Sequence, residues 1–170
     1  MIRRLRLHPA AALVLCALAT PLATTVANAA IASGALFGPR IGISSSPDQL
    51  VLGGQIEFPE FTPHVTVDPN VEIGVLDHQT VIALNADFFY HFAIEQSVWT
   101  PYAGLGLGVN VTQFDRNVYG PIDSRTDAGA NLVLGAGAPT RSGNRFFAEF
   151  RAGLGDIPSL KIMAGWNFGM

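Results

Sequence analysis

Histidines near a hydroxyl group and a glycine-rich stretch are the first places to look for chemistry in this chain. A nucleophilic mechanism needs a hydroxyl with a histidine able to take its proton, and the nearest arrangement is His64-Val-Thr66. His64, His78 and His91 lack the fixed spacing that is typical of a zinc site. The GLGLG stretch at residues 104–108 departs from the G-x-G-x-x-G spacing, and no helix pattern follows it. The sequence therefore predicts no catalytic residue, no metal site and no cofactor.

Acidic and basic residues occupy the polar positions of segments whose alternate positions are aliphatic. These residues are Arg40, Glu57, Glu72, Asp87, Glu149, Arg151 and Lys161, and His91 lies on the same face. The four acids and three bases nearly balance. Because buried charges persist only when they are paired, we expect a network of salt bridges wherever this face is enclosed by protein.

Eight extended segments position these residues. Alternation of apolar and polar residues between turn signals predicts a strand in each segment. The segments are residues 35–44, 50–58, 64–75, 80–92, 99–115, 127–137, 145–155 and 160–168. Pro69 interrupts the third segment and predicts a bulge or a local loss of pairing there.

Two all-β architectures compete for this pattern. In a soluble secreted β-sandwich the charged face would point to water. A uniform aliphatic face and segments of about nine to eleven residues instead favour a transmembrane barrel. Aromatic residues at the segment ends would form its interfacial girdle, namely Tyr90, Phe92, Trp99, Trp166 and Phe168. We therefore predict an all-β fold, an eight-stranded antiparallel up-and-down transmembrane β-barrel.

The alternation is clearest in the fifth segment, where Gly104, Gly106 and Gly108 share a face with Asn110. A glycine row has little use on a solvent-exposed face, but a crowded interior needs one to admit large side chains from neighbouring strands. In an eight-stranded barrel the interior is just wide enough for side chains to fill. We therefore expect this row to make room for Phe89, His91 and Tyr102.

The first residues have the order of a secretory signal peptide. Arg3, Arg4 and Arg6 precede an apolar run, and Ala27-Asn28-Ala29 is an Ala-x-Ala cleavage site. We expect residues 1–29 to be a signal peptide and residues 30–170 to be the barrel domain. The mature chain would have no cysteine and a formal charge of −6, from seven basic and thirteen acidic residues. Such a charge argues against nucleic acid as a partner.

Two stretches resemble a known family. WTPYAGLGLGVN at residues 99–110 and LKIMAGWNF at residues 160–168 are similar to the strands of the small eight-stranded outer-membrane β-barrel proteins of Gram-negative bacteria, of the OmpX, OmpW and OmpA-barrel type. The resemblance implies a place in the cell outer membrane and both termini in the periplasm. It also implies three partners: the lipid bilayer, lipopolysaccharide, and the barrel-assembly machinery, which would read the C-terminal strand. Residues 116–126 would then form the longest extracellular loop.

A structural or surface-interaction barrel with a packed polar lumen and no catalysis is the function that we expect. A narrow channel for small or hydrophobic solutes is one alternative. A lipid A-modifying outer-membrane enzyme is another, because the resemblance includes barrels with that activity.

Overall fold

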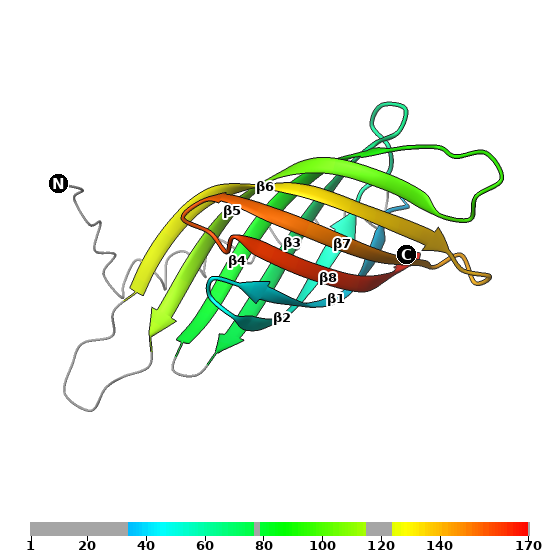
Figure 1. Ribbon diagram of the computed structural model, residues 1–170. Helices are drawn as coiled ribbons and strands as arrows, with labels where there is room; N and C mark the ends of the chain where they lie inside the picture. The colour runs from blue at the N-terminus through cyan, green and yellow to red at the C-terminus, as the bar shows by residue number, and fades with distance from the viewer. Residues whose placement is uncertain (1–33, 77–78, 115–123, 170) are drawn as a thin grey trace, which may run out of the picture.

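In the described part of the chain, eight antiparallel strands form a single closed sheet (Figure 1). The computed structural model describes residues 34–76, 79–114 and 124–169. The strands are β1 (Leu36–Ser45), β2 (Gln49–Glu57), β3 (Val65–Leu76), β4 (Gln79–His91), β5 (Thr100–Phe114), β6 (Ser124–Pro139), β7 (Arg145–Gly155) and β8 (Leu160–Gly169). Each strand pairs with the next, and β8 pairs with β1. The predicted up-and-down barrel is confirmed, and the β-sandwich alternative is wrong. Among the described residues no helix is long and apolar enough to cross a membrane.

The strand bounds differ from prediction mainly at β6. Residues 124–126, which we predicted as part of a loop, belong to β6 and pair with Val111–Gln113 of β5. Loss of alternation suggested a loop, but β5 continues to Phe114 and its backbone groups take these residues as partners. The rest of that predicted loop and the predicted signal peptide lie outside the described residues.

Pro69 interrupts pairing on one side of β3 only. The ladder between β3 and β4 runs through Pro69, which lies opposite Ala86. The ladder between β2 and β3 stops at the pair Gln55–Asn70, and the Phe58 N–H donates to the Val67 carbonyl further along in the same register. Proline has no N–H to donate, so the predicted local loss of pairing occurs here without a change of register.

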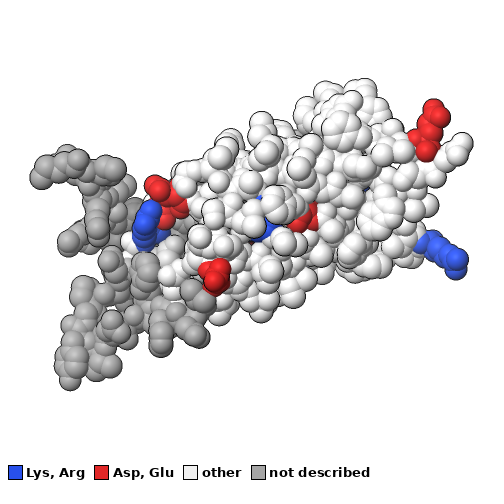
Figure 2. Space-filling model, in the orientation of Figure 1, with Lys and Arg blue, Asp and Glu red and all other residues white. Residues whose placement is uncertain are grey.

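The two faces of the sheet have opposite polarity. Large apolar side chains between 45 % and 65 % exposed point outward from every strand, among them Ile41, Leu52, Ile73, Leu84, Leu107, Leu134, Phe150 and Ile162. Polar side chains no more than 6 % exposed point inward from every strand, among them Arg40, Gln55, Asn70, Asp87, Asn110, Asn131, Arg151 and Asn167. Figure 2 shows a mostly uncharged surface between two ends where charged atoms are exposed. The barrel is therefore apolar outside and polar inside, as lipid requires.

The two ends of the barrel hold different turns. We call the end where β1 begins and β8 ends the terminal end; it also holds the turns at residues 58–64, 92–99 and 140–144. The opposite end, here the loop end, holds the turns at residues 46–48 and 156–159. There Ile157 is buried, and a β-carbon on Gly129 would lie 2.9 Å from two of its carbon atoms. The turn between β7 and β8 thus folds inward, in a space that glycine leaves open.

The glycine row of β5 makes room for side chains of β4. A β-carbon on Gly104 would clash with Phe89, one on Gly106 with Asp87, and one on Gly108 with Asn85. The expectation was correct for Phe89 but wrong for Tyr102, whose ring lies against Gly135 of β6 instead. It was also wrong for His91, which lies opposite Tyr102 in the ladder rather than opposite a glycine.

Candidate functional site in the barrel lumen

Two arginines and a glutamate form the centre of the lumen. Arg40 of β1 donates from Nη2 to Glu149 Oε2 at 2.7 Å, and Arg151 of β7 donates from Nε to the same oxygen at 2.8 Å. The side chains of all three are at most 1 % exposed. The Tyr102 hydroxyl donates a hydrogen bond to the other carboxylate oxygen of Glu149, Oε1, at 3.0 Å. These hydrogen bonds join β1, β5 and β7 across the interior.

The network extends to three further charged residues. Lys161 Nζ donates to Glu72 Oε2 at 2.6 Å, and Arg40 Nε lies 3.3 Å from Glu72 Oε1. Arg151 Nη2 donates to Asp87 Oδ2, which also accepts from Asn70 Nδ2 at 2.7 Å. Each of these acids therefore contacts a base. Removing one partner would leave the other as an uncompensated buried charge, which is the costly case.

A second cluster lies near the terminal end. Arg145 donates from Nη1 to Glu57 Oε1 and from Nη2 to His91 Nδ1, the latter at 3.0 Å. Asn167 Nδ2 donates to Glu57 Oε2 at 2.9 Å. Sequence reasoning included Glu57 and His91 but missed Arg145 and the buried Asp68. Both residues follow the alternation of their strands, so the inward face could have been read to include them.

Hydrogen bonds fix the protonation of His91. Arginine can only donate, so His91 Nδ1 is an acceptor and Nε2 carries the proton. Nε2 therefore donates to Thr66 Oγ1 at 3.1 Å, and the Thr66 hydroxyl donates to Asp68 Oδ1 at 2.9 Å. A histidine held in this tautomer cannot take a proton from the threonine. The one histidine–hydroxyl contact of the described residues is thus unsuited to activate a nucleophile.

The other chemistry-bearing residues are not assembled into a site. His64 is exposed in the turn before β3 and lies against the ring of Tyr90, with 5.9 Å between ring centroids, so it does not act together with the inward-facing Thr66. No group of three or more His, Cys, Asp or Glu side chains within the described ranges could hold a metal ion. The GLGLG stretch lies within β5, where its glycines face side chains of β4.

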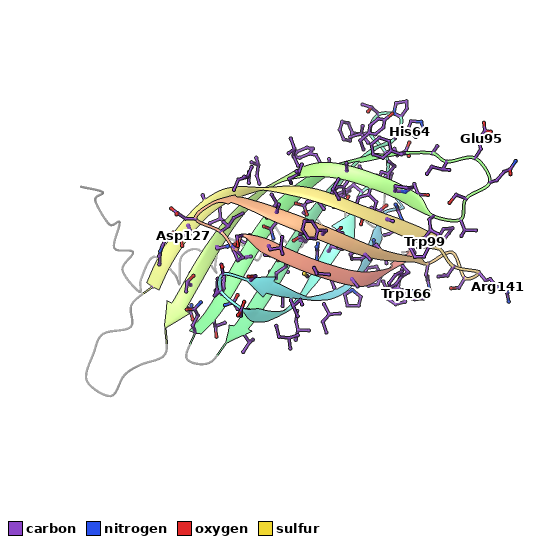
Figure 3. All side chains as sticks on the ribbon, in the orientation of Figure 1. His64, Glu95, Trp99, Asp127, Arg141 and Trp166 are labelled. Atoms are coloured by element: carbon purple, nitrogen blue, oxygen red, sulfur yellow. The ribbon has the colours of Figure 1, made fainter. Side chains whose placement is uncertain are left out.

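Aromatic rings gather on the outer surface at the terminal end. Tyr90 and Phe92 pack edge to face, with 5.1 Å between ring centroids, and Trp99 and Trp166 both contact Phe146, at 6.4 and 5.9 Å. Phe168 lies 6.1 Å from Phe37. Figure 3 shows Trp99 and Trp166 at this end and Asp127 at the other. Phe37 and Phe146 thus lie with the five aromatic residues predicted as a girdle.

Little space remains inside the barrel. An internal cavity of about 10 Å³ lies among Gln55, Glu57, Asp68, Phe89, His91, Tyr102, Arg145, Phe147 and Glu149. A cavity of this size holds about one water molecule. A larger cleft of about 680 Å³ opens at the terminal end. The lumen therefore contains no wide path from end to end in the described part of the chain.

Comparisons with known proteins agree with this architecture. Neither models of protein families nor curated protein sequences gave a match. Among solved structures, Neisserial surface protein A aligns with a TM-score of 0.65 at 14 % identity, covering 80 % of this chain and 96 % of that one. The N-terminal β-barrel domain of Pseudomonas aeruginosa OprF aligns with a TM-score of 0.64 at 15 % identity, covering 80 % of this chain and 98 % of that one. The outer membrane protein Ail of Yersinia pestis aligns with a TM-score of 0.50 at 15 % identity, covering 81 % of this chain and 99 % of that one. The chain therefore has the fold of the small eight-stranded outer-membrane barrels.

Proposed function

We propose that this protein is an integral barrel of the bacterial outer membrane with a structural or surface-interaction role, a closed lumen and no catalysis of its own. The observation that carries the proposal is the lumen itself. Buried ion pairs cross it from β1, β3, β4, β7 and β8, and the internal cavity is no larger than about one water molecule. A lumen filled in this way supports the barrel and leaves recognition to its outer surface and loops.

The outer surface supports the proposed location. Apolar side chains on every strand suit contact with hydrocarbon, and closure of the sheet pairs the backbone groups that lipid cannot satisfy. The aromatic cluster at the terminal end would lie at one membrane interface. The partners that we propose are the lipid bilayer and lipopolysaccharide, with the barrel-assembly machinery acting on β8. The signal peptide would direct export and be cleaved after Ala29.

The two alternatives are less well supported. A narrow channel for small or hydrophobic solutes would need a continuous path, whereas Arg40, Arg151 and Glu149 meet in the middle of the lumen. A lipid A-modifying enzyme would need a histidine free to accept a proton from a nucleophile, whereas His91 accepts from Arg145 and donates to Thr66.

Conductance of the purified protein in planar lipid bilayers tests the closed lumen. We expect no stable current steps from the wild-type barrel, because paired charges fill the cross-section. The double variant Arg40→Ser/Glu149→Ser removes one base and one acid together, so it should pass ions where the wild type does not. Stable ohmic steps from the wild-type protein would instead favour the channel.

A further inference from the structure

Among the described residues, acids outnumber bases in the lumen, and the surplus can be assigned to one residue. The inward-facing acids are Glu57, Asp68, Glu72, Asp87 and Glu149, and the inward-facing bases are Arg40, Arg145, Arg151 and Lys161. Counted over the described residues, five acids and four bases leave one acid without a base, and His91 is neutral in the tautomer described above. Each acid except Asp68 has a base within 4.0 Å. Asp68 is 3 % exposed, and its side chain has one hydrogen-bond donor, the Thr66 hydroxyl.

Asp68 lines the internal cavity rather than packing against other side chains on all sides. The carboxylates of Glu57 and Glu149 and the hydroxyl of Tyr102 line the same cavity. Its volume of about 10 Å³ suits a group the size of one water molecule. A primary ammonium group is of that size and has three N–H donors. Arg145 lines the cavity as well, but its guanidinium is paired with Glu57, so the cavity offers a small cationic head group hydrogen-bond acceptors and one carboxyl group without a base, that of Asp68.

The cleft at the terminal end adjoins this cavity. Glu57, His91 and Arg145 line both spaces and form the boundary between them. The cleft has a volume of about 680 Å³, within the range of small-molecule sites. Leu36, Phe58 and Ile94 give it an apolar wall. Glu60 adds a second acid whose only described contact is the backbone N–H of His64, at 2.9 Å.

We propose that the terminal end of the barrel binds small primary amines, with the ammonium group in the cavity beside Asp68 and the hydrocarbon chain in the cleft. The surplus of acids over bases selects a cation, and the size of the cavity selects an unsubstituted ammonium group over a bulkier one. The apolar wall of the cleft accommodates the methylene groups. Binding at this end needs no path through the lumen, so the site is compatible with a barrel that does not conduct.

Titration of the isotopically labelled full-length barrel in lipid nanodiscs tests the site, with amide chemical shifts as the readout. Butylammonium should give saturable shift changes at Thr66, His91 and Tyr102. Butanol has the same chain without the charge, and butyltrimethylammonium has the charge on a larger head group. Each should bind about tenfold more weakly or worse, as expected when a hydrogen bond between charged groups is lost.

Two matched variants assign the site to Asp68. Asp68→Asn should weaken butylammonium binding about tenfold or more, whereas Asp156→Asn, which removes an exposed acid at the loop end, should leave it unchanged. The gel shift on boiling verifies that both variants fold. Equal binding by the two variants would overturn the proposal. So would the absence of saturable binding by the wild type, or equal binding of butylammonium and butyltrimethylammonium.

Discussion

Replacement of Arg151 by methionine should lower the free energy of unfolding by about 3–5 kcal/mol, the cost of breaking a buried ion pair by removing one partner. Arg151 is 0 % exposed and donates to both Glu149 and Asp87. Methionine would leave Asp87 without a base and Glu149 with Arg40 alone. Reversible urea unfolding of the barrel in lipid vesicles measures the loss.

Arg125→Met is the matched control for that substitution. Arg125 also pairs with an acid, Asp127, at 2.7 Å, but its side chain is 60 % exposed at the loop end. An exposed pair contributes about 1 kcal/mol or less. The double variant Arg151→Met/Asp87→Asn should be less destabilised than the sum of its single variants, because the orphaned acid is removed with its base. Equal, small losses for Arg151→Met and Arg125→Met would contradict a charge network buried in the lumen.

Leu84→Arg should destabilise the protein more than Asn85→Arg, although the two positions are neighbours near the middle of β4. Leu84 is 56 % exposed on the outer face, where an arginine near the bilayer midplane costs about 2–4 kcal/mol. Asn85 is 7 % exposed inside and donates to Asn70 Oδ1 at 2.9 Å. Arginine there meets acids of the lumen, and crowding costs about 1–3 kcal/mol. Urea unfolding in vesicles compares the two variants.

A third variant separates lipid contact from a protein core at the same position. Leu84→Phe adds volume without charge. A side chain that faces lipid should accept the ring with little loss, whereas a close-packed core should reject it. Strong destabilisation by phenylalanine would show that Leu84 packs against protein, as in a sandwich.

The strands and their faces were predictable because a strand has a period of two and lipid makes the outer face uniformly apolar. Leu84 and Asn85 illustrate this, since their alternation alone assigns one to the outside and the other to the lumen. The inward charges followed from the same rule. The partners in each ion pair did not follow from this rule. Arg151 on β7 and Asp87 on β4 meet across the lumen, and alternation within one strand does not show which residues of other strands it faces.

The positions of side chains in the turns could not be predicted from the sequence either. Ile157 lies in the short turn between β7 and β8, and nothing in the local sequence shows that the space left by Gly129 lets it fold into the loop end. His64 and Thr66 are separated by a single residue in the sequence, but His64 turns outward and Thr66 bonds His91 from the next strand. Asp68 could not be identified as the surplus acid from the sequence, because that required knowing which bases reach which acids.

Cell fractionation followed by gel electrophoresis of unheated and boiled samples tests the central claim most directly, that this chain is an outer-membrane barrel. A closed barrel in which every strand pairs with two neighbours resists unfolding by detergent until it is heated. We predict that the protein appears in the outer-membrane fraction, dissolves in detergent, and changes its migration on boiling. A freely soluble periplasmic protein whose migration does not change on boiling would contradict the account.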